Sequence, residues 1–408
     1  MDRLTDAGVT ATSSLAPGRH TSAPSRRLRI LHVSETYGGG VETLVRQFTA
    51  QQISRGHSVH LLAPPGMASV QGVERSTWEP RRSRPTSVVP AVRTLRRTVR
   101  LHQPDVVHLH SFVAGLLGRL PVPAPLRLDV PVLYQPHAWS FQVFGMRSAA
   151  TAMRAWERRA SSRTDVLLTN CSDEVEEGRR SGITTAARVL GVAVDLERFR
   201  PASEALRERA RRDLGLTARH VLLCMGRLAH QKGQDLLVAA WEQRRPPDTV
   251  LVLLGPGDPA PLRALAPTQW GRSLVAAGGQ DDVRPWLWAT DVLLLPSRYE
   301  TIGLCVAEAM ACGVPVVATD VNGVRETVVA GPARPAGAVV PVRDMDALLD
   351  EAKTRLEDPL LRRTEGMNGR ARAEELFRPE RLADRLEDAY RDAVRAHRER
   401  TGERETTS

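Results

Sequence analysis

The sequence predicts an α/β fold in which the strands of parallel sheets alternate with helices. The chain has 408 residues, enough for two domains of ordinary size. Residues 292–295 form an apolar run without polar alternation, which is typical of a strand buried on both faces. Residues 303–312 follow as a helix that Gly313 and Pro315 end, and residues 314–318 form the next buried strand. This order of strand, helix and strand is the unit of a doubly wound parallel sheet.

The first unit of this kind lies near the amino terminus. Residues 28–34 are a predicted strand, residues 41–54 carry apolar side chains at helical spacing, and residues 58–63 are the next strand. Gly39 and Gly40 stand at the turn between the first strand and the helix. Glycines there let the backbone approach a ligand closely, and a helix N-terminus attracts negative charge. A plain tight turn explains these glycines equally well, because the G-x-G-x-x-G spacing is absent.

Other apolar runs predict the remaining strands of the first half, over residues 105–110, 131–136, 165–169 and 188–192. His108 and His110 project from one face of their strand. Such a pair suits either a metal site or buried structural histidines, and we favour the second. His137 directly follows a strand, at the end where parallel sheets bind ligands.

Two segments of the first half are strongly basic. A helix predicted from Val88 onward belongs to the first segment, which contains Arg81, Arg82, Arg84, Arg93, Arg96, Arg97 and Arg100. The second places Arg154, Arg158 and Arg159 after the aromatic residues Trp139, Phe141 and Phe144. Both suit a solvated helix face. The alternative is attraction to an anionic membrane or a phosphorylated acceptor, with the aromatic segment dipping into the membrane.

The second half repeats the alternation, with predicted strands over 221–225, 250–254, 273–277, 292–295, 314–318 and 337–342. Arg227 and Lys232 follow the first of these strands. A D-x-D motif occurs at Asp344 to Asp346, but it opens a helix, so we interpret Asp344 as its cap rather than as a metal ligand.

Two acidic residues mark the stretch from 291 to 319. Glu300 falls in the loop before the helix that starts near Gly303, and Glu308 falls inside that helix. The free N–H groups at the helix start favour a phosphate. Glu308 lies roughly 7 Å further along the axis, where a carboxylate accepts hydrogen bonds from neighbouring hydroxyls such as those of a ribose. The pattern therefore predicts a nucleotide lying along the helix.

This stretch resembles the retaining glycosyltransferases of family 4, which have the GT-B fold. The resemblance rests on the strand D-V-L-L-L-P-S, the motif E-x7-E and the string A-M-A-C-G-V-P, and it extends over roughly residues 28–395. It implies two Rossmann-like domains that face a central cleft. Thr301 departs from the Gly, Ser or Ala that usually follows the first Glu, and we expect its hydroxyl to narrow the sugar pocket.

The resemblance also implies roles for individual residues. Arg227 and Lys232 would neutralise the leaving diphosphate without a metal ion, while Glu300 and His137 would hold the sugar and Glu308 the ribose. The donor would further contact Gly39, Gly40, Thr301, Ile302, Gly303 and Leu304, and its base would lie against the segment from Gly279 to Val283. Two further positions depart from the family pattern. Ala138 follows His137 where the family often has Asp or Gly, and V-A-V-D ending at Asp195 stands where the family usually has Asn-Gly-Val-Asp near the hinge.

We expect four segments along the chain. Residues 1–25 are rich in Ser, Thr, Ala and Pro and are expected to be a disordered tail. Residues 26–200 would form the acceptor-side domain and residues 201–376 the nucleotide-sugar domain. Residues 377–408 would contain an amphipathic helix that crosses back to the first domain, with Leu382, Leu386, Tyr390 and Ala393 on its apolar stripe.

Composition narrows the partners. The formal charge is +10 and the pI about 10.3, which suits anionic substrates, anionic membranes or nucleic acid. Only 4% of residues are aromatic and no nucleic-acid-binding motif occurs, so we expect no nucleic acid partner. The four cysteines show no metal spacing, and Cys305 and Cys312 are expected to be buried as small hydrophobic side chains, which fits a reducing cytoplasm. No run of eighteen apolar residues predicts a membrane span.

The sequence thus predicts a metal-independent glycosyltransferase without a cofactor. It would use a nucleotide diphosphosugar, with a UDP-sugar favoured, and a small-molecule, glycan or lipid-linked acceptor. It would act in the cytoplasm, with peripheral contact to the inner membrane face left open. A nucleotide-sugar 2-epimerase of the same fold and, more remotely, a basic nucleic-acid-binding protein are the alternatives.

Overall fold

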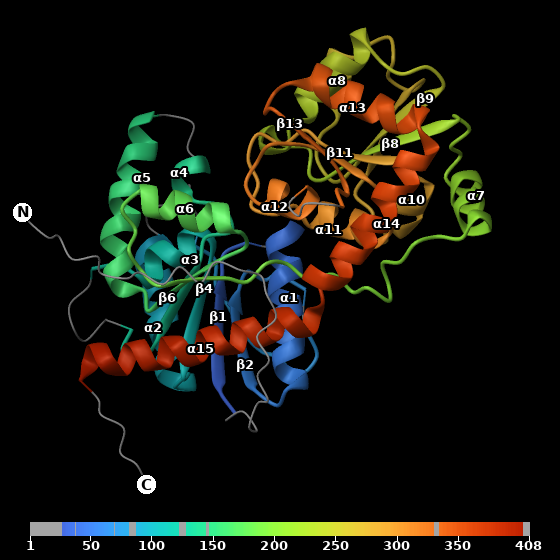
Figure 1. Cartoon of the computed structure of the whole chain (residues 1–408). Coiled ribbons are helices and arrows are strands. Elements are labelled where there is room, and N and C mark those ends of the chain that lie inside the picture. The colour runs from blue at the N-terminus through green and yellow to red at the C-terminus, as the bar shows by residue number, and fades with distance from the viewer. Residues whose placement is uncertain are drawn as a thin grey trace, which may run out of the picture.

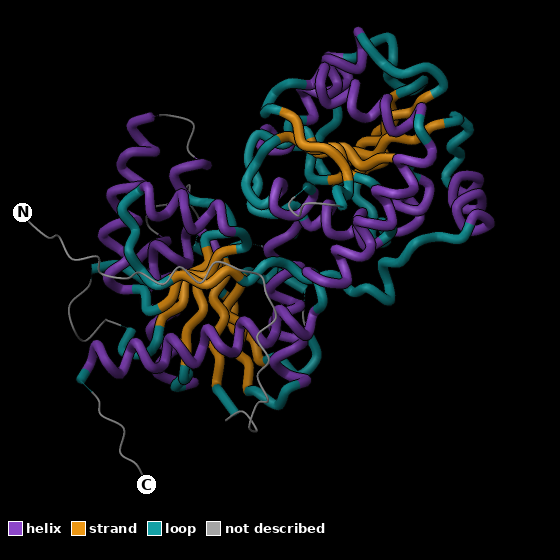
Figure 2. The backbone as a smooth tube through the Cα atoms, in the orientation of Figure 1, coloured by secondary structure: helices purple, strands orange, loops and turns teal. Residues whose placement is uncertain are grey.

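The computed structural model shows two α/β bodies that face each other (Figure 1). It describes residues 27–36, 38–68, 70–80, 87–121, 128–143, 147–329 and 334–402. Each body contains a parallel sheet with helices packed against both faces (Figure 2). The predicted GT-B architecture of two Rossmann-like domains is therefore confirmed.

The first domain is built on a seven-stranded sheet in the order β3-β2-β1-β4-β5-β6-β7, and all its paired strands are parallel. The strands are β1 Arg29–Ser34, β2 Ser58–Ala63, β3 Glu74–Thr77, β4 Val106–His110, β5 Val132–Gln135, β6 Val166–Thr169 and β7 Ala187–Val189. The helices are α1 Gly39–Ser54, α2 Val88–His102, α3 Ser111–Gly118, α4 Ser140–Val143, α5 Arg147–Ala160, η3 Ser161–Arg163 and α6 Ser172–Arg180.

The second domain has a six-stranded sheet in the order β10-β9-β8-β11-β12-β13, also parallel. The strands are β8 His220–Met225, β9 Thr249–Leu254, β10 Leu274–Gly278, β11 Val292–Leu295, β12 Val316–Thr319 and β13 Gly337–Val340. The helices are α7 Glu204–Asp213, η4 His230–Lys232, α8 Gln234–Gln243, α9 Ala260–Leu265, α10 Arg284–Ala289, α11 Leu304–Ala311, α12 Val324–Val328, α13 Met345–Glu357 and α14 Pro359–Leu376. Asp344 caps α13 by accepting a hydrogen bond from the Ala347 N–H at 3.0 Å, as predicted.

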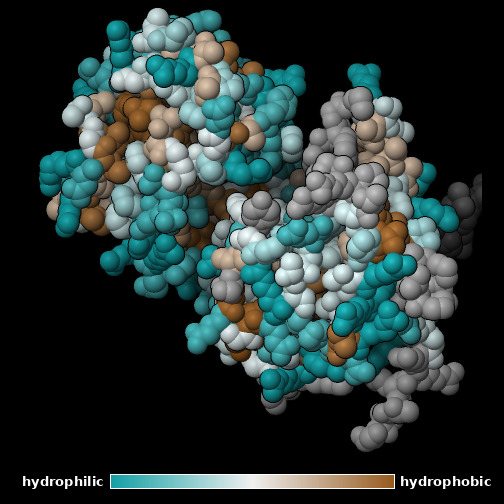
Figure 3. All heavy atoms as spheres, turned by 180° about the vertical axis from the view of Figure 1, so that it is seen from behind, coloured by the Kyte–Doolittle hydropathy of each residue, from teal (hydrophilic) through white to brown (hydrophobic). Residues whose placement is uncertain are grey.

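The order of strands creates a topological switch point in each sheet. In the first sheet the chain runs from β1 through β2 to β3 on one side and then returns to place β4 on the other side of β1. In the second sheet it runs from β8 through β9 to β10 and then places β11 on the other side of β8. Loops after two such neighbouring strands diverge and leave a crevice at their carboxyl ends, which is where open α/β sheets bind ligands. A furrow separates the two bodies in the space-filling view from behind (Figure 3).

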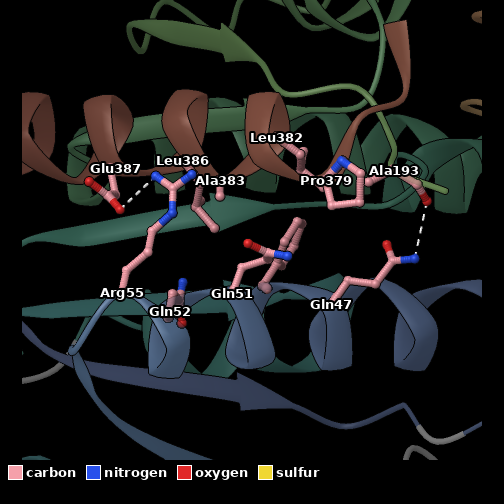
Figure 4. A pocket seen from close by; sticks show the side chains of 11 residues that line it. Gln47, Gln51, Gln52, Arg55, Ala193, Pro379, Leu382, Ala383, Leu386 and Glu387 are labelled. Carbon is pink, nitrogen blue, oxygen red and sulfur yellow. Dashed lines mark hydrogen bonds and ion pairs between the residues drawn. The ribbon is translucent and has the colours of Figure 1, made fainter. Parts of the chain in front are cut away.

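The final helix, α15 Pro379–Thr401, returns to the first domain and lies against α1 (Figures 1 and 4). Its predicted apolar stripe is buried, at Leu382, Leu386, Tyr390 and Ala393. Where the chain crosses between the domains, the Val194 N–H donates a hydrogen bond to the Phe377 carbonyl at 2.9 Å. The two crossing segments are thus joined side by side, and this junction fixes the entry of α15 onto the first domain.

Candidate active site

The switch point of the second sheet brings together a cation and a carboxylate that are 68 residues apart. Lys232 ends η4 after β8, and Glu300 lies in the loop after β11. The Lys232 ammonium forms an ion pair with Glu300 Oε1, and the Ser297 hydroxyl donates to the same oxygen at 2.9 Å. Arg227 leaves the carboxyl end of β8 into the same region and is exposed. The structure therefore places Lys232, Glu300 and Arg227 at the carboxyl ends of neighbouring strands, as the sequence predicts.

The ion pair is largely shielded from solvent, with 16% of the Lys232 side chain and 7% of the Glu300 side chain exposed. Burial alone would lower the pKa of Lys232, but the charge and hydrogen bond of Glu300 outweigh it and raise that pKa. The lysine therefore stays cationic at neutral pH. A fixed positive charge in a site of low dielectric interacts strongly with a phosphate group.

The glycine turn of the first domain approaches this cluster from the opposite side. Gly39 has φ of +72°, and a Cβ placed on it would lie 3.7 Å from Arg227 Nε. A Cβ placed on Gly40 would lie 3.5 Å from Leu304 Cδ1 of the second domain. The helix α1 starts at Gly39, two residues earlier than the apolar pattern predicts, so both glycines belong to its first turn. The N-terminus of α1 thus lies beside Arg227 across the domain boundary.

A second helix start lies beside the same cluster. Gly303 is the N-cap of α11 and has no side-chain cap, which leaves the first amides of the helix for another acceptor. Ile302 is 8% exposed and Leu304 is half-buried. Glu308 projects from the second turn of α11. Burial raises its pKa to about 7, and the positive charge of Arg198 acts in the opposite direction.

Thr301 takes part in a contact between the domains that the sequence did not reveal. Its buried hydroxyl accepts a hydrogen bond of 2.9 Å from Asn170 Nδ2, and Asn170 Oδ1 accepts one of 2.8 Å from Gln135. The Gly323 N–H donates to the Asp173 carboxylate at 2.9 Å nearby. The threonine that stands where the family usually has Gly, Ser or Ala therefore adds a hydrogen bond between the two domains. Whether the same side chain narrows a sugar pocket stays a prediction.

His137 follows β5 with an uncommon backbone conformation. It has φ of +55°, a region that side chains rarely adopt outside tight constraints. Its Nε2 lies 3.0 Å from His110 Nδ1, and its Nδ1 is a buried atom that has no hydrogen-bond partner among the described residues. Burial lowers the pKa of His137 to about 3, so the ring is neutral.

His110 belongs to a histidine cluster on β1 and β4. His32, His108 and His110 each place a ring nitrogen within 4.8 Å of the others, which would suit a metal ion. However, His32 Nδ1 and His110 Nε2 already share a hydrogen bond of 2.8 Å. This internal bond supports the prediction of structural histidines over a metal pair.

The segment predicted to read the base lies at the end of β10. A Cβ placed on Gly279 would contact Pro256, in the loop after β9, at 3.5 Å, and Val283 is the N-cap of α10. The Leu228 N–H donates to the Pro256 carbonyl at 2.8 Å, so the loops after β8, β9 and β10 lie side by side. Gly279 and Val283 are therefore on the same edge of the sheet as Arg227.

The alternative of an aromatic segment that dips into a membrane is wrong for Trp139 and Phe141. Trp139 is fully buried and donates from its indole to the Glu174 carbonyl at 2.9 Å, and Phe141 is 3% exposed. Neither ring can enter a membrane while the domain is folded, whereas Phe144 falls outside the described residues. Arg96 is also buried, so it is not part of a basic surface. In the described ranges no helix is both long and apolar enough to cross a membrane.

Four cysteines are buried and free: Cys171, Cys224, Cys305 and Cys312. The predicted burial of Cys305 and Cys312 is therefore confirmed. Burial raises the pKa of each thiol, to about 12 for Cys224, Cys305 and Cys312.

Comparisons with known proteins identify the family of the chain. Residues 38–198 match the family model "Glycosyltransferase Family 4", and residues 219–358 match "Glycosyl transferases group 1". A D-inositol 3-phosphate glycosyltransferase of Saccharomonospora viridis is 30% identical over 406 residues, covering 88% of this chain and 90% of that protein.

One further relative is similar in sequence over about half of the chain, and one solved structure is similar in fold. A GDP-mannose-dependent monoacylated alpha-(1-6)-phosphatidylinositol monomannoside mannosyltransferase of Corynebacterium glutamicum is 35% identical over 210 residues, which cover 48% of this chain and 54% of that protein. The solved structure of sucrose-phosphate synthase from Thermosynechococcus elongatus superposes with a TM-score of 0.78 at 25% identity. It covers 91% of this chain and 100% of that chain.

Proposed function

This chain is a glycosyltransferase of family 4, and from that premise we propose that it moves a sugar from a nucleotide diphosphosugar to an acceptor hydroxyl with retention at the anomeric carbon. The observation that carries the proposal is the Lys232–Glu300 ion pair at the switch point, with Arg227 beside it and the Gly39 turn opposite. A diphosphate placed there would face two cations and two helix N-termini.

The reaction needs the diphosphate to leave as an anion. The bond between the anomeric carbon and the diphosphate oxygen breaks, the acceptor oxygen bonds to that carbon, and the acceptor proton passes to the departing phosphate oxygen. Lys232 supplies a point charge and Arg227 a two-pronged donor, and both interact more strongly with the diphosphate as its charge develops. Glu300 holds Lys232 in place and, with His137, would hold the sugar.

The remaining contacts would position the donor along the second domain. The first amides of α11, at Gly303 and Leu304, would bind a phosphate. Glu308 would accept hydrogen bonds from the ribose hydroxyls, and the base would lie against Gly279 and Val283. Since the cations are supplied by the chain itself, we propose that the reaction requires neither a metal ion nor a cofactor.

The donor is proposed to be a UDP-sugar, with GDP-mannose as the rival because the Corynebacterium relative is named for it. The acceptor is proposed to carry a phosphate, as in the name of the Saccharomonospora relative. A net charge of +10 supports an anionic acceptor. Exposed arginines of α2 support peripheral contact of a cytoplasmic protein with an anionic membrane, namely Arg93, Arg97 and Arg100.

A thermal-shift panel of UDP-, GDP-, ADP- and TDP-sugars tests the donor. One nucleotide should raise the melting temperature more than the others, and Glu308→Ala should reduce that shift. An unchanged shift in Glu308→Ala would show that the ribose assignment is wrong. Incubation of the best donor without acceptor separates the alternatives, because a new sugar epimer would indicate an epimerase rather than a transferase.

A further inference from the structure

A chain of buried polar side chains links the last helix to the active site. Tyr390 of α15 is fully buried, and Gln52 of α1 donates from Nε2 to the Tyr390 hydroxyl at 2.9 Å. Figure 4 shows Gln52 on α1, the helix that packs against α15. The other end of the amide, Gln52 Oε1, lies 2.8 Å from His32 Nε2. The contact joins residues 338 positions apart, so the docking of α15 reaches directly into the first sheet.

This series of hydrogen-bonded side chains continues through the histidines as far as His137. His32 Nδ1 lies 2.8 Å from His110 Nε2, and His110 Nδ1 lies 3.0 Å from His137 Nε2. Burial lowers the pKa of His32 to about 4 and of His137 to about 3, and it holds that of His110 well below its usual value. All three rings are therefore neutral, and each carries one proton on one nitrogen.

The hydrogen bonds fix which nitrogen carries each proton. An amide oxygen only accepts, so His32 must carry its proton on Nε2, toward Gln52. His32 Nδ1 then accepts from His110, which must be protonated on Nε2. His110 Nδ1 in turn accepts from His137 Nε2–H. The remaining nitrogen, His137 Nδ1, is left with a lone pair, and it is one of the buried atoms that have no hydrogen-bond partner among the described residues.

The Tyr390 hydroxyl is the acceptor toward which the Gln52 amide turns its Nε2, so that Gln52 Oε1 faces His32. The hydroxyl lies 3.2 Å from His108 Nδ1 as well as 2.9 Å from Gln52 Nε2. Burial raises the pKa of Tyr390, so the hydroxyl keeps its proton. Because the hydroxyl oxygen accepts from the Gln52 amide, its proton can point to His108 Nδ1. Without this acceptor Gln52 is free to turn over, and a reversed amide would reverse every donor and acceptor as far as His137.

We propose that Tyr390 and Gln52 are positioning residues that fix the tautomer of His137, so that its Nδ1 accepts a hydrogen bond from a hydroxyl of the donor sugar. This inference rests on the proposed function, because it gives a chemical direction to the contact of His137 with the sugar. A nitrogen that only accepts favours binding of a sugar whose hydroxyl donates a hydrogen bond to it. A deoxy or fluoro substituent at that carbon cannot donate and leaves the buried nitrogen unpaired.

Long-range 1H–15N correlation spectra of the full chain, selectively labelled at histidine, test the tautomers before any ligand is added. We expect His32, His110 and His137 in the Nε2–H form. Tyr390→Phe keeps the volume and removes the hydroxyl, so it should give a mixture of both tautomers at His137. Gln52→Leu, which breaks the chain at its next member, should do the same. Gln47→Leu is the matched control, because this glutamine of α1 donates to the Ala193 carbonyl instead and should leave the spectra unchanged.

Monodeoxy and monofluoro analogues of the best donor test the consequence. In the wild type, at least one position should lower kcat/KM by about tenfold or more when its hydroxyl is removed. That discrimination should weaken by about threefold or more in Tyr390→Phe and stay unchanged in Gln47→Leu.

An Nδ1–H form of His137 in the wild type would overturn the inference, as would unchanged tautomers in both Tyr390→Phe and Gln52→Leu. These results come from the free protein, so they are distinguishable from failure of the proposed function, which would appear as the absence of transfer from every donor. Equal use of all analogues by the wild type would also overturn the proposed role of the His137 acceptor.

Discussion

Donor binding should depend on pH through Glu308. Burial raises the pKa of this carboxyl from an ordinary 4.5 to about 7. Only the ionised carboxylate accepts hydrogen bonds from two ribose hydroxyls, so affinity should increase as pH rises through 7. The ionised fraction grows about tenfold from pH 6 to pH 8 for a group of this pKa. We therefore expect the Kd of the nucleotide sugar to fall by about tenfold over that range.

Calorimetric titration at pH 6, 7 and 8 measures this effect. An intact nucleotide sugar is the proper ligand, because a terminal phosphate itself titrates near pH 6. Glu308→Gln should bind more weakly at pH 8 and with little pH dependence, while Glu357→Gln, a change on the distant helix α13, should behave like the wild type. A tenfold pH dependence that persists in Glu308→Gln would refute the reasoning.

The same shift predicts the sign of a stability effect. The folded pKa lies above the unfolded one, so folding favours the protonated carboxyl, and stability falls as pH rises from about 4.5 to 7. The shift corresponds to about 3 kcal/mol as an upper bound. Glu308→Gln should therefore be more stable than the wild type at pH 8 by about 1–3 kcal/mol and similar to it at pH 4.5. Urea unfolding at the two pH values measures the difference.

Three other substitutions probe the site. Gly39→Ala forces a side chain onto a φ of +72° beside Arg227, so it should destabilise the protein by about 1–2 kcal/mol and lower kcat, as measured by urea unfolding and initial rates. Thr301→Val removes the acceptor of the Asn170 amide and should loosen domain closure, seen as a larger radius of gyration with bound donor in X-ray scattering. Lys232→Ala leaves a buried carboxylate without its cation and should destabilise by about 3 kcal/mol, measured by urea unfolding.

Each of these substitutions has a control within the chain. Gly40→Ala is the control for Gly39→Ala, because Gly40 does not have a positive φ and its added Cβ would meet Leu304 at an ordinary contact distance. An equal loss of stability in both variants would contradict the argument from the backbone conformation. Thr301→Ser keeps the hydroxyl and should scatter like the wild type. The double variant Lys232→Ala with Glu300→Ala should recover part of the stability, and strict additivity of the two losses would mean that the pair does not interact.

The central strands could be predicted from the sequence because they are buried on both faces. The strand predicted over 292–295 coincides with β11. Four consecutive apolar residues indicate a strand without a solvent-exposed face, and all four are buried. β3 was missed because its four residues, Glu74–Thr77, are polar and lie at the sheet edge. An edge strand is held by pairing to one neighbour, and its own sequence need not be apolar.

The site shows the same limit. Lys232 and Glu300 could be placed together because each follows a strand, and the carboxyl ends of adjacent parallel strands meet at one edge. The contact of Tyr390 with Gln52 could not be predicted, because it depends on where α15 docks. One signal was present: a tyrosine within an otherwise aliphatic stripe has a hydroxyl that needs a partner once it is buried.

The most direct test of the account is turnover by a variant carrying both Arg227→Ala and Lys232→Ala, assayed with the wild type in the presence of EDTA. The account predicts that the wild type keeps its full rate in chelator and that the double variant loses at least about a thousandfold in kcat/KM. Full activity of the double variant in EDTA would contradict it. A wild type that stops in EDTA and recovers with added Mg²⁺ would contradict it as well.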